Sequence, residues 1–160
     1  MSNNLKEGAL APQFSLHDQT GKTVKLSDFK GKKRVVLYFY PKDDTPGCTV
    51  EACGFRDENE KFEKEDAVVL GVSPDDEGSH QKFIQKFKLP FTLLCDKSKE
   101  VCQNYGVWIE KNMYGKKYWG VARTTFIIGK DGKIEKIYEK VKPEGHNQEI
   151  LDFLKSGERR

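Results

Sequence analysis

Two cysteines five residues apart have the clearest chemical potential in this sequence. Cys48 and Cys53 follow the end of a predicted strand and a tight turn, within the first turns of a predicted helix. At a helix start, unpaired backbone N–H groups converge and the helix dipole is positive, so a thiolate is favoured over a thiol. We therefore predict that Cys48 is a reactive nucleophile and that Cys53 is its redox partner.

The five-residue spacing sets a condition on any bond between the two sulfurs. On one regular helix the two residues would be separated by roughly 7.5 Å of rise and about 140° of rotation. A disulfide needs Cα atoms within about 7 Å of each other and converging Cβ vectors. Forming the bond therefore requires local unwinding of the helix. The spacing predicts a nucleophile that reacts alone and is captured by its partner afterwards.

Ionisation of the thiol would not by itself make a fast peroxidase. Full ionisation of a thiol with a pKa of about 8.5 raises its reactivity at pH 7 about 30-fold, or roughly 2 kcal/mol of barrier. Rapid peroxide reduction also needs donors placed on the oxygens where charge develops. The candidates are Thr45, a backbone N–H at the helix start, and Arg123. An arginine early in an otherwise apolar strand is costly unless its charge is used.

The elements that must position these residues are a buried strand and the helix after it. Residues Arg34–Tyr40 form a continuous apolar run rich in β-branched and aromatic side chains, which is typical of a strand buried on both faces. Pro41 ends the strand, and Thr45 with Pro46 predicts a helix start, with threonine at the N-cap and proline at the first helical position. The helix is expected to end near Asp66 and to turn three apolar residues toward the core: Val50, Phe55 and Phe62.

The rest of the chain alternates strands and helices. We expect an N-terminal β-hairpin over residues 10–26, strands at 67–72 and 91–95, helices at about 76–88, 98–105 and 147–155, a polar loop at 110–117, and a β-hairpin formed by residues 121–128 and 134–141. This order predicts an α/β fold with a central mixed sheet flanked by helices on both faces. Without a linker or a repeat, the 160 residues are expected to form a single domain, residues 1–160.

Several motifs resemble one enzyme family. The pattern Pro41-x-x-x-Thr45-x-x-Cys48 is similar to the active-site motif of peroxiredoxins. The longer string from Tyr38 to Asp57 resembles the bacterioferritin-comigratory, or Q-type, class, in which a second cysteine lies five residues on. Further matches lie at Pro12-x-Phe14-x-Leu16, Tyr105–Trp108, Met113–Tyr118 and Arg123–Ile128. The resemblance therefore covers nearly the whole chain in order.

That resemblance implies a thioredoxin fold with an N-terminal β-hairpin extension and a monomeric, thioredoxin-dependent thiol peroxidase. Cys48 would be the peroxidatic cysteine, which attacks a hydroperoxide and becomes a sulfenic acid. Cys53 would be the resolving cysteine, which closes an intramolecular disulfide that thioredoxin or a similar dithiol protein reduces. Pro41 would shield the site, Thr45 would hydrogen-bond the peroxide, and Arg123 would stabilise the thiolate and the transition state. No metal or organic cofactor is implied.

Charge and composition give little reason to expect other partners. Lys and Arg total 28 and Asp and Glu total 25, a net charge of +3 with the signs interspersed, which argues against nucleic-acid or membrane binding. The first eight residues have no apolar core of signal-peptide length, and no run approaches a membrane span. We therefore expect a cytoplasmic protein, in which disulfides tend to be transient and catalytic.

Three other interpretations of the cysteines stay open on the residues alone. A thioredoxin-like protein disulfide oxidoreductase is the main enzyme alternative, although the sequence lacks a Cys-x-x-Cys motif. A Cys₄ zinc-binding module departs from the usual spacings and would use Cys48, Cys53, Cys95 and Cys102. A cysteine hydrolase that pairs Cys48 with a histidine lacks a recognisable orienting partner.

Other polar and sulfur-containing residues are expected to be structural. Cys95 and Cys102 lie in apolar patterns and should pack as small hydrophobic residues. On the residues alone, Cys53 could also be a packing residue and Thr45 only a helix cap. The solvated helix face is expected to carry Glu51, Arg56 and Asp57. All three histidines are expected at the surface: His17, His80 and His146.

Overall fold

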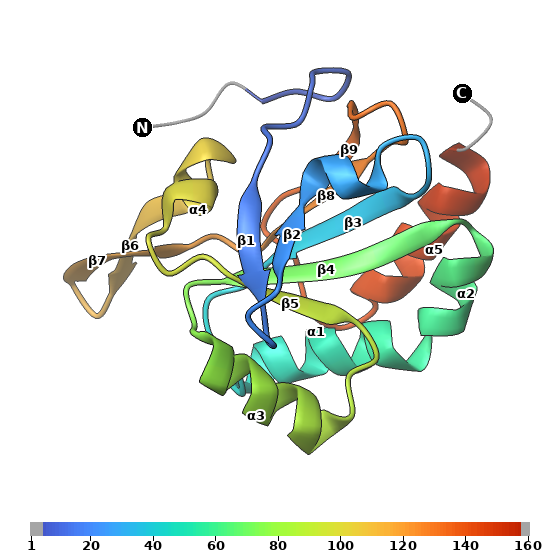
Figure 1. Cartoon of the computed structure of the whole chain (residues 1–160). Coiled ribbons are helices and arrows are strands. Elements are labelled where there is room, and N and C mark those ends of the chain that lie inside the picture. Colours follow the sequence, from blue (N-terminus) through green and yellow to red (C-terminus); the bar gives the residue numbers. More distant parts are fainter. Residues whose placement is uncertain (1–4, 158–160) are drawn as a thin grey trace.

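The computed structural model describes residues 5–157 and contains a seven-stranded sheet with helices on both faces (Figure 1). Its strands lie in the order β2-β1-β5-β4-β3-β8-β9, and β6 pairs with β7 in a separate two-stranded sheet. The strands are β1 (Ser15–Asp18), β2 (Thr23–Lys25), β3 (Arg34–Phe39), β4 (Ala67–Ser73), β5 (Thr92–Cys95), β6 (Trp108–Met113), β7 (Lys116–Val121), β8 (Thr124–Ile128) and β9 (Ile134–Tyr138). The helices are α1 (Pro46–Asp57), α2 (Asn59–Lys64), α3 (Glu77–Phe87), α4 (Glu100–Asn104), α5 (His146–Gly157) and a short 3-10 helix, η1 (Leu26–Phe29). Within residues 5–157, every helix is too short or too polar to cross a membrane.

Strand β3 lies near the middle of the sheet and leads to the cysteine-bearing helix. It runs parallel to β4, where Val36 lies opposite Val69, and antiparallel to β8, where Val36 lies opposite Ile127. Strands β1 and β2 form the predicted N-terminal hairpin, and β1 also pairs with β5. The predicted mixed sheet is therefore confirmed. All six residues of β3 are buried because both faces are covered, as its continuous apolar run predicts.

Apolar side chains fill the space on both faces of the sheet. On one face, Leu26 of η1 and Val101 of α4 pack in a layer with residues of β3, β8 and β9. The other layer receives side chains from four helices, α1, α2, α3 and α5, and its members include Phe55, Phe62, Phe83 and Leu154. The predicted flanking of the sheet by helices is confirmed, and Cys48 lies in this second layer.

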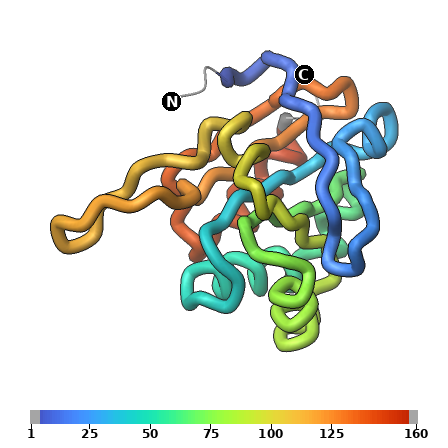
Figure 2. Tube along the Cα trace, turned by 60° about the vertical axis from the view of Figure 1, so that its left-hand side comes forward, coloured from blue at the N-terminus to red at the C-terminus, as the bar shows by residue number. Residues whose placement is uncertain are grey.

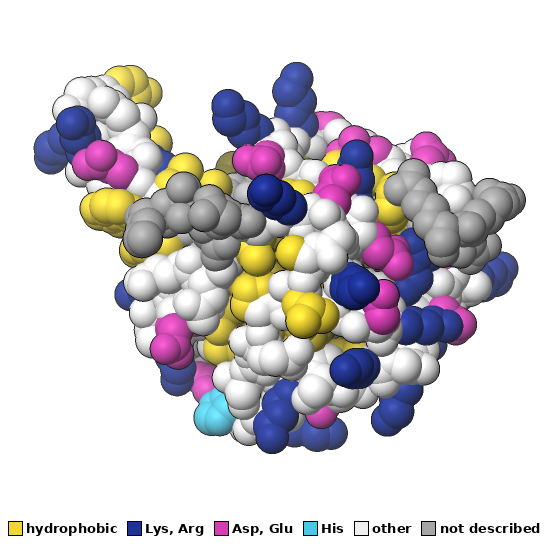
Figure 3. Space-filling model, turned by 90° about the horizontal axis from the view of Figure 1, so that it is seen from above, with side chains coloured by type: hydrophobic (Ala, Val, Ile, Leu, Met, Phe, Trp, Pro, Cys, Tyr) yellow, Lys and Arg dark blue, Asp and Glu magenta, His cyan; other side chains and the backbone are white. Residues whose placement is uncertain are grey.

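Residues 108–121 form a hairpin that projects from the body of the molecule, and we call it the arm (Figure 2). The prediction of a polar loop at 110–117 is therefore wrong. Strands β6 and β7 pair across a two-residue turn in which Tyr114 and Gly115 both have positive φ, as a tight hairpin turn requires. The arm buries little of its surface, so its strands lack the alternation of apolar residues that would predict them. Figure 3 shows basic, acidic and hydrophobic side chains on it.

The cysteine-bearing helix is shorter than predicted. The helical stretch that was expected to end near Asp66 consists of two helices, α1 and α2. Phe55 and Phe62 are fully buried, as expected, but Val50 is 42% exposed. The buried residues of α1 are Cys48, Glu51, Ala52 and Phe55, which recur at the spacing of one helical face, and Val50 lies off that face.

Candidate active site

Cys48 is the third residue of α1 and is buried at the helix start. Thr45 occupies the N-cap position and Pro46 the first helical position, as predicted. The Thr45 hydroxyl does not cap the helix, however, because it donates to the carbonyl of Lys42 at 3.0 Å. Pro46 has no N–H, so the first free backbone donors of the helix belong to Gly47 and Cys48 themselves. A negative charge on the Cys48 sulfur would lie at the positive end of the helix dipole.

Arg123 lies directly against the sulfur of Cys48. Its Nη2 is 3.4 Å from Sγ of Cys48, and its Nη1 donates to Oε1 of Glu51 at 2.7 Å. Arg123 sits in the short break between β7 and β8, so the predicted strand over residues 121–128 is interrupted at this point. A Cβ atom on Gly47 would lie 3.0 Å from Nη2, so glycine at this position leaves room for the guanidinium.

Glu51 was expected on the solvated face of the helix, and that prediction is wrong. The residue is 2% exposed and forms an ion pair with Arg123. Burial raises the pKa of the Glu51 carboxyl to about 7, against the opposing effect of the Arg123 charge and hydrogen bond. The sequence did contain a signal, because Glu51, three residues after Cys48, lies on the same helical face as the nucleophile and Phe55.

Cys53 lies on the same helix as Cys48. Helix α1 runs unbroken through both cysteines, Cys53 is half-buried, and both thiols are free. The geometric condition set by the spacing therefore applies to the folded chain: a bond between the two sulfurs requires α1 to unwind locally.

The other two cysteines are poorly placed for redox chemistry. Cys95 of β5 and Cys102 of α4 are buried. Burial raises the pKa of the Cys95 thiol to about 12 and the pKa of Cys102 well above its ordinary value. Cys48 and Cys102 belong to core layers on opposite faces of the sheet, so one zinc ion cannot hold all four sulfurs. The Cys₄ alternative is therefore wrong.

Two of the three histidines were predicted wrongly as surface residues. His17 is exposed, as expected, but His80 and His146 are almost completely buried. Nε2 of His146 lies 2.8 Å from the Thr125 hydroxyl, and its Nδ1 lies 2.6 Å from Glu149. Each buried histidine has one bond to a residue more than twenty positions away, Asp43 for His80 and Thr125 for His146, and local patterns carry no sign of these bonds.

Pro41 begins a five-residue segment, residues 41–45, that follows Tyr40 and leads into α1; we call it the entry loop. Pro41 is half-buried, and the N–H of the preceding Tyr40 still donates to the sheet, at 3.0 Å from the Val72 carbonyl. The entry loop therefore leaves the sheet at Pro41 and delivers Thr45 to the start of α1. Pro41, Thr45 and Cys48 belong to this one junction, and Arg123, 75 positions after Cys48, adjoins it.

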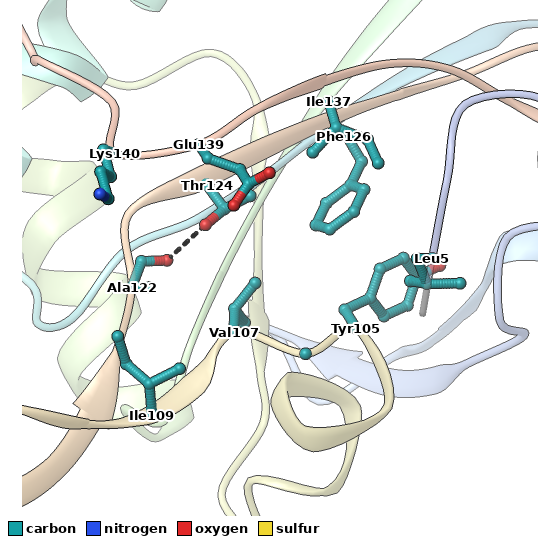
Figure 4. A pocket seen from close by; sticks show the side chains of 11 residues that line it. Leu5, Tyr105, Val107, Ile109, Ala122, Thr124, Phe126, Ile137, Glu139 and Lys140 are labelled. Atoms are coloured by element: carbon teal, nitrogen blue, oxygen red, sulfur yellow. Dashed lines mark hydrogen bonds between the residues drawn. The ribbon is translucent and has the colours of Figure 1, made fainter. Parts of the chain in front are cut away.

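A separate cavity of about 210 Å³ lies at the base of the arm (Figure 4). Its walls include Val107, Ile109 and Phe126, and the hydroxyl of Thr124, another lining residue, donates to the carbonyl of Ala122 at 2.9 Å. Cys48, Arg123 and Glu51 are not among the lining residues. The cysteine chemistry is therefore located at the helix start and not in this cavity.

Comparisons with known proteins agree with the geometry. The sequence model described as the AhpC/TSA family matches residues 8–137. Peroxiredoxin Bcp of Bacillus subtilis is 51% identical over 148 residues, which cover 92% of this chain and 94% of that protein. Peroxiredoxin Bcp of Escherichia coli K12 is 48% identical over 153 residues, which cover 96% and 97%.

Solved structures give the same result for the fold. A cysteine-to-serine mutant of Xylella fastidiosa PrxQ superposes with a TM-score of 0.92 at 34% identity, over 98% of this chain and 99% of that one. Bacterioferritin comigratory protein of Xanthomonas campestris, studied for its alkyl peroxide reduction activity, gives a TM-score of 0.87 at 35% identity over the same shares. The predicted thioredoxin fold with an N-terminal hairpin is confirmed. The chain therefore belongs to the AhpC/TSA family and, within it, to the peroxiredoxins of the Bcp, or Q, type, which are thiol peroxidases.

Proposed function

We propose that this peroxiredoxin reduces hydrogen peroxide and organic hydroperoxides with Cys48 as the attacking nucleophile. The observation that carries the proposal is the 3.4 Å contact between Nη2 of Arg123 and Sγ of Cys48 at the start of α1. A guanidinium and a helix N-terminus that meet at one sulfur provide a favourable place for the negative charge of the reaction. The Arg123 donors also lie close to where the oxygens of a peroxide must sit during attack.

In the first step, the Cys48 thiolate attacks the terminal oxygen of the hydroperoxide. An S–O bond forms as the O–O bond breaks, the sulfur is oxidised to a sulfenic acid, and the departing alkoxide or hydroxide takes up a proton to leave as alcohol or water. Arg123 stabilises the negative charge that moves from sulfur to oxygen. The Thr45 hydroxyl turns from its bond with Lys42 to hydrogen-bond the peroxide, and Pro41 shields the site from solvent.

In the second step, Cys53 resolves the sulfenic acid. The Cys53 sulfur attacks the Cys48 sulfur, an S–S bond forms, and the hydroxyl leaves as water with the thiol proton. The position of both residues on α1 supports a resolution step in which the helix unwinds between them.

In the third step, a dithiol protein such as thioredoxin reduces the disulfide. Two electrons and two protons pass from the dithiol to Cys48 and Cys53, and the reductant becomes a disulfide. The thiols of the chain supply the chemistry without a metal or an organic cofactor. We further propose that the chain acts as a single-domain monomer, residues 1–160, in the cytoplasm, where such a disulfide is transient.

The test is peroxide-dependent consumption of NADPH in an assay coupled through thioredoxin and its reductase. Cys48→Ser should abolish turnover, whereas Cys53→Ser should allow one oxidation event and accumulate a sulfenic or over-oxidised Cys48. Cys95→Ser serves as the matched control and should turn over normally, because its buried thiol is remote from the proposed chemistry. Absence of NADPH consumption with every hydroperoxide would refute the proposal, and would leave a thioredoxin-like disulfide oxidoreductase as the alternative.

Two further measurements test the resolution step. Mass spectrometry after one equivalent of peroxide should show a loss of two hydrogens, with the bond mapped between Cys48 and Cys53. Circular dichroism should show a loss of helix on oxidation, at most the twelve residues of α1. An unchanged helix content in a protein with the mapped bond would contradict the unwinding argument.

A further inference from the structure

A buried polar network holds the entry loop, and none of the steps above uses it. Asp43 and His80 are both buried, and Oδ2 of Asp43 lies 2.7 Å from Nδ1 of His80. The same oxygen accepts from the Ser79 hydroxyl at 2.7 Å, and Oδ1 accepts from the Tyr40 hydroxyl at 2.5 Å. The backbone N–H of Asp43 donates to Asp75 at 2.8 Å. One residue of the entry loop is thus tied to Tyr40 directly after β3, to α3 and to the segment between β4 and α3.

The second ring nitrogen of His80 fixes the protonation of the pair. Nε2 lies 2.9 Å from the carbonyl oxygen of Leu94, which can only accept, so Nε2 carries a proton. The short contact between Nδ1 and Asp43 holds one further proton. The pair is then neutral as a whole, either as imidazolium and carboxylate or as imidazole and carboxylic acid. Such a pair can be buried without leaving an unpaired charge.

The same residues do not present an open metal site. One donor atom from each of Asp43, Asp75 and His80 lies within 4.8 Å of the others. Both nitrogens of His80 are already engaged, however, and Oδ2 of Asp75 accepts from the Ser73 hydroxyl at 2.7 Å as well as from the Asp43 N–H. The donors and acceptors of His80 and Asp75 named here already have hydrogen-bond partners within the protein. The network therefore acts through its hydrogen bonds.

The entry loop needs an anchor because of its backbone conformation. Asp44 has a φ of 58°, in the left-handed region that residues other than glycine adopt at a cost. Its carboxylate pairs with Lys86 at the surface, and exposed ion pairs contribute little. The carbonyl of Thr45 accepts from the N–H of Thr49 at 2.8 Å and so begins the helix. The position of the entry loop therefore fixes where α1 starts and where Cys48 lies.

Helix α3 holds the other end of α1 as well. Nη1 of Arg56, near the end of α1, donates to the carbonyl of Phe87, the last residue of α3, at 2.9 Å. His80 lies near the beginning of α3 and bonds to the entry loop. Unwinding of α1 between Cys48 and Cys53 is thus bounded on both sides by contacts to the same helix.

We propose that Asp43 and His80 are positioning residues for the peroxide reaction: their buried pair fixes the entry loop against α3 and so sets the places of Thr45 and Cys48. The inference rests on the proposed function, because it concerns the same site. Attack on peroxide needs reacting groups aligned to within about an ångström, and misplacement by that distance costs about 100-fold in rate. Resolution proceeds through an unwound α1 and does not need that alignment. Loss of the pair therefore slows attack and leaves disulfide closure as fast as before or faster.

Single and double variants separate positioning from mere stability. His80→Leu leaves the Asp43 carboxyl buried without its partner, so this variant should be both less stable and slower to attack. The double variant Asp43→Ala/His80→Leu removes the buried carboxyl together with its histidine partner, so no unpaired carboxyl stays in the core while the entry loop is left unanchored. His80→Asn supplies an amide N–H in place of Nδ1 and should restore part of the attack rate. Cys102→Ala, in the opposite core layer, is the control for lost stability alone.

The decisive measurement is the rate of sulfenic acid formation with hydrogen peroxide, followed by quenched flow and mass spectrometry in a Cys53→Ser background. We expect the double variant to attack at least tenfold more slowly than the parent, and Cys102→Ala to attack at the parent's rate. Disulfide closure, measured with Cys53 present, should be unslowed in the double variant.

Three results would overturn the inference: an attack rate in the double variant within twofold of the parent, an equal slowing in Cys102→Ala, or closure slowed as much as attack. A parent protein that does not react with peroxide would instead refute the proposed function. The two failures are therefore distinguishable in one experiment.

Discussion

The buried carboxyl of Glu51 makes a quantitative prediction about stability and pH. Its pKa is about 7 in the folded protein, whereas a glutamate in the unfolded chain has an ordinary pKa of 4.5. The folded state therefore binds this proton more tightly than the unfolded state does. Well below pH 4.5 the group is protonated in both states, so it does not make the free energy of unfolding depend on pH. As the pH rises from 4.5 to 7, the unfolded state ionises first and the folded state loses relative stability.

The size of this loss follows from the two pKa values. The difference between about 7 and 4.5, at about 1.4 kcal/mol for each factor of ten, is roughly 3 kcal/mol, fully developed above pH 7. Glu51→Gln removes the titrating group and keeps an oxygen that can accept from Arg123. We therefore expect the difference in free energy of unfolding, Glu51→Gln minus wild type, to increase by roughly 3 kcal/mol between pH 4.5 and pH 8.

The assay is urea unfolding of both reduced proteins at half-unit steps across that pH range. Subtracting one curve from the other cancels the titrating groups that do not interact with Glu51, and a constant offset from the new amide does not affect the slope. A difference that stays flat between pH 4.5 and pH 8 would refute the assignment of a raised pKa to Glu51. So would a slope of the opposite sign.

Three further predictions concern the same junction. Arg123→Lys removes the fork that reaches both Cys48 and Glu51, and should lower kcat/KM for peroxide about 100-fold in the coupled assay; a change under threefold would contradict the role of Arg123. Gly47→Ala places a methyl 3.0 Å from the guanidinium and should slow peroxide reduction about tenfold while the melting temperature changes little. Iodoacetamide should leave both buried thiols, Cys95 and Cys102, unlabelled in the folded protein, as peptide mass mapping would show.

Much of the fold could be predicted because its central elements bury continuous or periodic apolar faces. The run at 34–40 is β3 almost to the residue, and the Thr45–Pro46 start of α1 is where the sequence places it. The arm could not be predicted, because two strands that bury little need no apolar alternation. The available signal was Gly115, because glycine is typical of a tight hairpin turn, in which Tyr114 and Gly115 both have positive φ.

The site was predictable where a local rule applied and hidden where contacts are distant. Arg123 could be placed beside Cys48 because a charged residue in an apolar stretch needs a use for its charge. The charge of Glu51 led to a wrong prediction of solvent exposure, although its spacing of three residues from Cys48 indicated the same helical face. The pairing of Asp43 with His80 joins residues 37 positions apart, and nothing in either neighbourhood indicates it.

The placement of Cys48 on the buried face of α1 couples the redox state of the chain to its folding energy. If Cys48 and Cys53 bridge as proposed, oxidation must pull Cys48 out of a core layer shared with Ala52 and Phe55. The free energy lost in disrupting that packing is returned when the disulfide is reduced, and each 1.4 kcal/mol of it raises the reduction potential by about 30 mV. Core packing that is remote from the sulfur chemistry thus makes the disulfide a better electron acceptor. A substitution that creates a cavity beneath α1 would destabilise the reduced fold. It would lower the reduction potential of the disulfide by the corresponding amount, so that the oxidised enzyme would be harder to reduce.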